Sequence, residues 1–463
     1  MNEYADPRAS AIATAHAYFD DGAFIDDLAR LVEVPTVSQD PEALPVLHRY
    51  LQEMIAPYLS EDGFSCEFFD NPEPDGTPLM IAERHEDDSL PTVLVYGHGD
   101  VVPGQENKWR DGLGPWKPVV EEDHIYGRGT ADNKGQHWIN FTALRTVLRA
   151  KGKLGFNCKI LMEMGEERGS YGLGAFCEIH KERLAADVLI ASDGPRLNSA
   201  TPTVMLGSRG SQNIALSVKL RDGAFHSGNW GGIIKDPGIL LTQAIASITD
   251  KRGQIRIPEW RPTSLTDKVR AALANCPVTS EGEPQIDPDW GEVDLSVSER
   301  LFGWNSFAVL ALDHGDIDKP VNAIYPSSRA IVQLRTVVGT DHEDIMPALR
   351  RHLDREGFPE VEIEPARKSS MVATRSDADD PWVRRAAKSV ASATGKEPVV
   401  LPNIGGSIPN DLFANLIGMP TIWLPHSYAA CAQHGPNEHL LGSVAREALG
   451  MMTGVFWDAG EAA

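Results

Sequence analysis

The chain has 463 residues, and its 43 basic and 66 acidic side chains give a formal charge of −23 at pH 7. This length favours two domains, and the negative charge argues against nucleic acid or an anionic membrane as a partner. No stretch approaches the roughly 18 to 20 apolar residues of a membrane span, and the first residues lack a signal-peptide pattern. With five scattered cysteines and no Cys-x-x-Cys pair, the composition predicts a cytoplasmic protein without a disulfide framework.

The first 200 residues alternate apolar strands with helical patterns. Strands are predicted at 92–96, 157–164 and 187–191, and a helix at 135–149 separates the first two strands. A strand, a crossover helix and a second strand are typical of a parallel or mixed sheet that is flanked by helices. Ligands bind such sheets beyond the carboxyl ends of the strands, so we expect functional residues directly after these strands.

After about residue 212 the pattern becomes that of an α+β domain. The predicted elements are strands at 213–220, 306–312 and 329–335, and amphipathic helices at 237–249 and 342–355. The segment 252–298 is rich in proline and polar residues, which predicts a long irregular excursion with some helix near 265–274.

The α/β pattern returns after about residue 369. It predicts a helix at 381–394, a strand at 421–424 and a final helix at 437–456. The sequence therefore predicts an α/β domain made of residues 1–211 and 370–463, and an α+β domain of residues 212–369 that interrupts it.

Five short segments place carboxylates or imidazoles after a predicted strand or in a glycine-rich loop. They are Gly97-His98-Gly99-Asp100, Gly129-Thr130-Ala131-Asp132-Asn133-Lys134-Gly135, Gly165-Glu166-Glu167, Ser192-Asp193-Gly194 and His434-Gly435-Pro436-Asn437-Glu438. Each segment alone is a weak signal, because a lone His-x-Asp or Glu-Glu pair is usually an ordinary loop or surface feature. Together, nitrogen and oxygen ligands without thiolates suit a catalytic zinc site that keeps a position open for water.

These segments resemble the M20 family of metallopeptidases, which includes carnosinase-like dipeptidases, glutamate carboxypeptidases, aminoacylases, and the acetylornithine and succinyl-diaminopimelate deacylases. The resemblance covers nearly the whole chain. The motifs most similar to the carnosinase-like dipeptidases are Tyr126-Gly127-Arg128-Gly129, Asp132-Asn133-Lys134-Gly135, Gly207-Ser208-Arg209-Gly210 and Phe225-His226-Ser227-Gly228. The resemblance implies a di-zinc, aminopeptidase-like α/β catalytic domain with an inserted α+β lid that also forms a dimer.

The resemblance also implies which residues bind the two zinc ions of each subunit. The implied ligands are His98 and Asp193 for one ion, Glu167 and His434 for the other, and Asp132 as the bridge between them. Manganese or cobalt could replace zinc, because the same ligands accept all three metals. His439 follows His434 by five residues, and we expect it to lie outside the ligand shell.

Two further carboxylates have implied roles in the reaction. Glu166 would be the general base that takes a proton from the attacking water and passes it to the leaving amine. Asp100 would accept the second imidazole N–H of His98 and so fix the tautomer of that ligand.

The substrate is expected to meet residues of both domains. The resemblance implies that His226 reaches the scissile carbonyl from the lid of a partner subunit, which requires a homodimer. Arg335 would clasp the carboxylate of the substrate, and Asn322, Gly406 and Ser407 would contact the rest of it.

One position departs from the family pattern. Tyr325 stands three residues after Asn322, where the family usually has proline, so the geometry of this loop is not carried over. Pocket residues from 252–306 are not identified by the sequence.

The function that the resemblance implies is hydrolysis of dipeptides or short peptides that have a free carboxylate. N-acyl-amino-acid deacylation is the alternative, because the metals and the base are common to both reactions. A single structural zinc would need a closed set of four ligands, in which cysteine is favoured. A non-catalytic relative would be expected to lack Glu166 or a ligand, and none is missing.

Overall fold

The computed structural model describes residues 6–278, 285–367 and 370–461. It divides into two compact units. Residues up to Gly207 and from Arg375 onward form the α/β unit, and Ser208–Pro277 with Gln285–Thr374 form the inserted unit. The sequence-based boundaries after residues 211 and 369 lie near these positions. Parts of the predicted ranges at 1–5, 279–284, 368–369 and 462–463 lie outside the described residues.

Among the described residues, a mixed sheet of eight strands forms the centre of the α/β unit, in the order β1-β2-β6-β3-β7-β17-β9-β16. In that order the strands are β1 Ser65–Phe69, β2 Leu79–Arg84, β6 Asn157–Glu163, β3 Thr92–His98, β7 Val188–Ala191, β17 Thr421–Trp423, β9 Thr203–Met205 and β16 Val399–Leu401. Strands β6, β3, β7 and β17 run parallel, while β1 and β2 add antiparallel strands at one edge. The prediction of a mixed sheet is confirmed.

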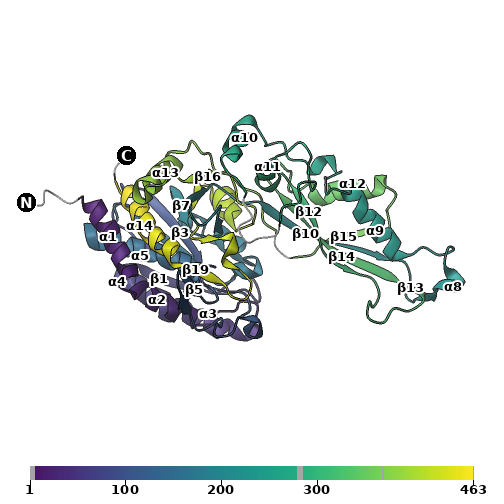
Figure 1. Ribbon diagram of the computed structural model, residues 1–463, viewed down its shortest axis with the longest axis horizontal. Helices are drawn as coiled ribbons and strands as arrows, with labels where there is room; N and C mark the ends of the chain where they lie inside the picture. Colours follow the sequence, from purple (N-terminus) through teal and green to yellow (C-terminus); the bar gives the residue numbers. More distant parts are fainter. Residues whose placement is uncertain (1–5, 279–284, 368–369, 462–463) are drawn as a thin grey trace, which may run out of the picture. The chain divides into compact units, whose positions relative to one another are not determined.

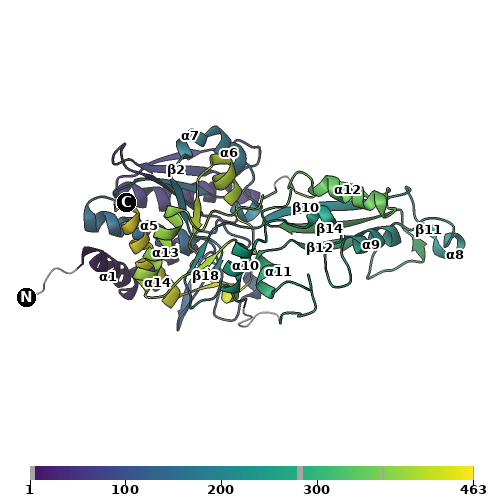
Figure 2. The same ribbon diagram turned by 90° about the horizontal axis from the view of Figure 1, so that it is seen from above.

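Helices cover both faces of this sheet (Figures 1 and 2). On one face lie α1 Pro7–Asp20, α2 Ala23–Val32, α3 Leu44–Arg49, α4 Ala56–Glu61, α5 Lys134–Lys151, α13 Pro381–Thr394 and α14 Gly442–Ala459. The other face is covered by α6 Leu173–Ile179, α7 Lys181–Leu184 and the π-helical turn η6 Leu412–Ile417. Side chains alternate along a strand, so Val95 faces the first group of helices, while the ring of Tyr96 packs against Phe413 and Trp423.

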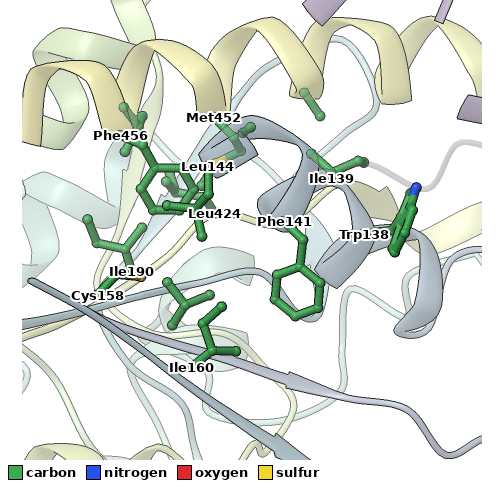
Figure 3. Packing of buried hydrophobic residues seen from close by; sticks show 14 of the residues in the cluster. Trp138, Ile139, Phe141, Leu144, Cys158, Ile160, Ile190, Leu424, Met452 and Phe456 are labelled. Atoms are coloured by element: carbon green, nitrogen blue, oxygen red, sulfur yellow. The ribbon is translucent and has the colours of Figure 1, made fainter. Parts of the chain in front are cut away.

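Helix α5 is buried around most of its circumference, although polar residues such as Gln136, His137 and Asn140 are among its buried side chains. Figure 3 shows Leu144 of α5 among Ile190 of the sheet and Met452 and Phe456 of α14. Because the helix is covered by the sheet on one side and by α14 on the other, its first eleven residues are all buried. It ends at Gly152, whose left-handed φ of +73° suits glycine.

The final helix differs from its prediction. It begins at Gly442 rather than at residue 437, because His439–Leu441 form strand β19, which pairs with β5 (His124–Tyr126). The remaining small strands of the unit are β4 Val119–Glu121, β8 Pro195–Arg196 and β18 Ser427–Tyr428. Its remaining short turns are η1 Pro41–Ala43, η2 Tyr50–Ile55, η3 Glu106–Lys108, η4 Glu166–Arg168 and η7 Ala429–Cys431.

The inserted unit is an antiparallel sheet in the order β12-β14-β10-β15, with helices α9 and α12 packed on one face. Its strands are β10 Gly210–Lys219, β11 Phe225–His226, β12 Ser306–Asp313, β13 Ala323–Ile324, β14 Ser327–Thr336 and β15 Glu362–Pro365. Its helices are α8 Ser227–Trp230, α9 Pro237–Ile248, η5 Pro258–Trp260, α10 Asp267–Ala274, α11 Val297–Phe302 and α12 Ile345–Arg355. The short pair β11 and β13 lies with α8 beyond one end of the sheet (Figure 1).

Across the part of the chain that the structure describes, no helix has the length and apolarity that a membrane crossing requires.

Candidate metal centre

Three neighbouring parallel strands place candidate ligands beyond their carboxyl ends, on the same side of the sheet. His98 is the last residue of β3, Glu167 lies in a turn after β6, and Asp193 follows β7. Asp132 comes from the loop before α5, and His434 from the loop before β19. Residues that are up to 336 positions apart therefore meet because parallel strands end at the same edge.

The five residues form two groups that share Asp132. The first group is His98, Asp132 and Asp193, and the second is Asp132, Glu167 and His434; within each group the candidate ligand atoms lie within 4.8 Å of one another. Asp132 directs one carboxylate oxygen to each imidazole, with Oδ1 at 3.1 Å from Nε2 of His98 and Oδ2 at 3.3 Å from Nε2 of His434. This is the arrangement that a bridging carboxylate requires.

The two groups differ in how firmly they are held. His98 is fully buried at the end of a strand, and its Nε2 also lies 3.7 Å from Oδ2 of Asp193. The side chain of His434 is 60% exposed and lies 3.1 Å from Oε2 of Glu167, which is itself 3% exposed. The buried imidazole of the first group thus belongs to a strand of the sheet, whereas the exposed imidazole of the second group comes from a loop.

The charges at the centre fit divalent cations. Burial, together with the Asp132 carboxylate, raises the pKa of Glu167 to about 7 and that of Asp193 to about 6. Burial also raises the pKa of Glu166 well above its ordinary value. Hydrogen bonds with Asp132 and Glu167 raise the pKa of His434 to about 11. Buried carboxylates that crowd together in this way need compensating positive charge, and the imidazole and carboxylate donors without thiolate match zinc or related metals.

Asp100 connects the two sides of the centre. Nδ1 of His98 lies 3.1 Å from the backbone oxygen and 3.3 Å from Oδ1 of Asp100, so the ring presents Nε2 to the shared carboxylate. The carboxylate of Asp100 also accepts the backbone N–H groups of Glu166 and Glu167, at 3.2 and 3.1 Å. Asp100 therefore orients one ligand and anchors the turn that carries another.

The other predicted residues of the α/β unit lie as follows. Gly406 and Ser407 are in the loop after β16, and neither belongs to the two ligand groups. His439 lies in β19 outside both groups, where its Nε2 is 2.9 Å from the hydroxyl of Tyr428.

The remaining predicted residues belong to the inserted unit. His226 ends β11, and the backbone oxygen of Asn322 accepts the N–H of Ser227, the residue after His226. Arg335 lies near the end of β14, between Ser211 and Ser306 in the sheet register. Tyr325, at the position that departs from the family pattern, packs its ring against His314.

Two residues that the sequence reasoning quoted only as motif letters make close contacts with the centre. Glu438 accepts three backbone N–H groups of the Asp132 loop, and Arg128 forms a buried ion pair with Glu438. A buried charge is expected to have a partner of opposite charge. The presence of Arg128 in one motif and Glu438 in another was therefore the sequence feature that could have indicated this ion pair.

Comparisons with known proteins relate the chain to one family. The profile of peptidase family M20/M25/M40 matches residues 94–456. A Beta-Ala-His dipeptidase of Mus musculus is 34% identical over 254 residues, 51% of this chain, and the chain spans about half (50%) of the length of that relative. A Cys-Gly metallodipeptidase of Saccharomyces cerevisiae is 26% identical over 451 residues, covering 90% of this chain and 91% of that protein. The solved structure of the dipeptidase Dug1p from Saccharomyces cerevisiae has a TM-score of 0.80 at 21% identity, and the match covers 97% of this chain and 99% of that chain.

Proposed function

Because the chain belongs to peptidase family M20/M25/M40, we propose that it is a metallopeptidase that hydrolyses dipeptides or short peptides with a free carboxylate. The observation that carries this proposal is Asp132, whose two carboxylate oxygens face imidazoles of two separate ligand groups. The similarity to proteins named Beta-Ala-His dipeptidase and Cys-Gly metallodipeptidase supports the choice of a dipeptide substrate.

The proposed cofactors are two zinc ions, one in each ligand group, with manganese or cobalt as metals that the same donors accept. When bound, such ions would lower the pKa of a water molecule and polarise the scissile carbonyl. His98 and Asp193 would hold the first ion, Glu167 and His434 the second, and Asp132 both.

Glu166 is the proposed general base. It is adjacent to Glu167 but belongs to neither ligand group, so its carboxylate is available to take a proton from the attacking water. The same carboxylic acid then gives that proton to the leaving amine. Asp100 supports this role, because its hydrogen bonds to the N–H groups of Glu166 and Glu167 keep base and ligand in one fixed turn.

A homodimer is proposed because, among the described residues, the sheet of the inserted unit ends in an edge strand that pairs on one side only. Strand β12 lies at the edge of its sheet, and Val309, Leu310 and Leu312 on it are 47, 51 and 50% exposed. An exposed apolar edge strand readily pairs with another strand. Antiparallel pairing of β12 with the same strand of a second copy is self-complementary, as a two-fold axis requires.

The surroundings of His226 support its proposed action in trans. Phe225, Trp230 and Ile233 lie close to it in the sequence and are 41, 43 and 73% exposed. An apolar surface of this kind around an exposed imidazole is typical of a contact with another molecule. We propose that this contact is the α/β unit of the partner subunit, where His226 would stabilise the developing oxyanion.

Action in trans predicts the activity of a mixed dimer. Co-expression of His226→Ala and Glu166→Ala chains with different affinity tags allows the mixed dimer to be isolated. In trans, the site with an intact Glu166 receives the intact His226 of its partner, so one of two sites works and about half of the wild-type rate is expected. Each parent dimer is expected to lose about 10²-fold or more. A mixed dimer as inactive as its two parents would show that His226 acts in cis, and a fully active His226→Ala parent would show that His226 has no role in the reaction.

Arg335 is proposed to bind the carboxylate of the substrate. Arg335→Met is expected to lower kcat/KM by about 10- to 100-fold, mainly through KM, because an ion-paired hydrogen bond is lost. C-terminally amidated dipeptides, which lack the carboxylate, should be cleaved at the same rate by both proteins. Arg329→Met changes an exposed arginine on the same side of β14 and serves as the control. An equal loss on amidated and free dipeptides would contradict the assignment.

The substrate class is tested by incubating the metal-loaded protein with a mixture of dipeptides and N-acyl amino acids and measuring released amino acids by mass spectrometry. Cleavage of dipeptides is expected. Cleavage of the acyl compounds alone would move the chain to the deacylases. We also propose a cytoplasmic location, because none of the five cysteines, all of which the structure describes, forms a disulfide.

A further inference from the structure

A buried ion pair lies between the two loops that carry Asp132 and His434. Arg128 precedes Asp132 by four residues, and Glu438 follows His434 by four. Nη1 of Arg128 is 2.5 Å from Oε2 of Glu438, and both side chains are 1% exposed. Because burying a charge is unfavourable even when it is paired, such a pair needs many additional hydrogen bonds to persist.

Those hydrogen bonds run to the backbone of both loops. Oε1 of Glu438 accepts the N–H groups of Gly129, Ala131 and Asp132 at 3.0, 3.1 and 3.2 Å. On the other side, Nη2 of Arg128 donates to the carbonyl oxygen of Gly435 at 2.9 Å. The pair therefore links the backbone of the bridging ligand to the residue directly after His434.

Arg128 also reaches a third loop. Its Nη2 donates to the carbonyl oxygen of Pro103 at 3.2 Å. The same loop contacts the His434 segment twice, because Nε2 of Gln105 donates to the backbone oxygen of His434 at 3.1 Å and the N–H of Arg110 to Oδ1 of Asn437 at 2.8 Å. Arg128 thus holds both Gly435, the residue after His434, and the Pro103 loop, which in turn contacts the His434 segment.

The His434 segment needs such support. Ala432, His434 and Asn437 have φ angles of +57°, +61° and +63°, a region that non-glycine residues adopt only at a cost. Since the side chain of His434 is 60% exposed, packing does little to hold it. His98, in the other ligand group, is fully buried at the end of β3 and has no comparable need.

We propose that the Arg128–Glu438 ion pair is a positioning device that sets the separation between Asp132 and His434. Loss of the ion pair should therefore weaken metal binding by the group of Asp132, Glu167 and His434. It should affect binding by the group of His98, Asp132 and Asp193 far less. This inference rests on the proposed two-metal centre.

The test is Glu438→Gln, which keeps the size of the side chain and one oxygen acceptor but removes the charge that Arg128 faces. Metal-free protein is titrated with Zn2+ in a calorimeter, and bound zinc is counted by mass spectrometry after gel filtration. The tighter of the two sites should keep its dissociation constant within about threefold, and the weaker site should lose about 10- to 100-fold, as substitutions behind metal ligands commonly do.

The matched control is Asp62→Asn. It neutralises one partner of the Arg145–Asp62 ion pair, whose side chains are 13 and 10% exposed and which contacts neither ligand group. This control should bind two ions as the wild type does, even if its melting temperature falls. Should Glu438→Gln fail to fold, Arg128→Lys carries the same test, because lysine keeps the charge but not the planar fork of donors.

Equal weakening of both sites in Glu438→Gln, or two unchanged sites, would overturn the inference. A wild-type protein that binds fewer than two ions would instead reject the proposed centre itself, so the two failures are distinguishable.

Discussion

Replacing Glu166 by alanine is expected to lower kcat by about 10²- to 10⁴-fold while both metal ions remain bound. The carboxylate of Glu166 belongs to neither ligand group, and the backbone N–H of Glu166 donates to Asp100. Removal of the Glu166 side chain should therefore leave the metal ligands in place. The loss should appear in kcat and in kcat/KM to a similar degree, because proton transfer occurs in the transition state and not in substrate binding.

The measurement combines steady-state kinetics on a dipeptide with a zinc count on the same preparation. Glu166→Gln is the matched variant, since it keeps the shape and polarity of the side chain but cannot take up a proton, and it should be about as inactive as the alanine variant. If either variant retained more than about a tenth of the wild-type kcat, Glu166 could not be the base.

Replacing Asp132 by alanine is expected to affect both ligand groups at once. Its Oδ1 faces His98 and its Oδ2 faces His434, so no other single residue among the five candidate ligands belongs to both groups. The variant should bind less than one zinc ion per chain at micromolar metal, and activity should fall at least as far as in Glu166→Ala. Without the shared carboxylate, each group keeps only two of its three donors.

His434→Ala provides the comparison, because it changes a ligand of the second group only. It should retain about one ion per chain, bound by the buried group of His98, Asp132 and Asp193. Equal metal contents in the two variants would contradict the assignment of Asp132 as the bridge. Folding of both proteins is checked by circular dichroism, so that loss of metal is not confused with loss of structure.

Much of the fold could be predicted because its elements are determined by local patterns. The buried strands β3, β6 and β7 are short continuous apolar runs, and α13 has the bounds that its periodicity predicts, from Pro381 to Thr394. Where a distant segment decides the structure, the local pattern fails. Residues 439–441 continue a helical pattern, yet they form a strand because β5, more than 300 residues earlier in the chain, pairs with them.

For the candidate site too, the residues that follow local patterns could be predicted and those that depend on distant contacts could not. His98, Glu167 and Asp193 could be located from sequence because each follows an apolar strand, and the carboxyl ends of adjacent parallel strands meet at one edge. The role of Glu438 could not be predicted, because its contacts with Arg128 and the Asp132 loop join positions about 310 residues apart. Only the three-dimensional arrangement reveals which backbone groups it satisfies.

Anomalous diffraction from crystals of the zinc-loaded protein tests whether two metal ions share Asp132. We predict two anomalous peaks about 3.5 to 4 Å apart, one on each side of the Asp132 carboxylate. One peak lies next to His98 and Asp193, and the other next to Glu167 and His434. A single peak, or two peaks that do not both contact Asp132, would show that Asp132 does not bridge two ions.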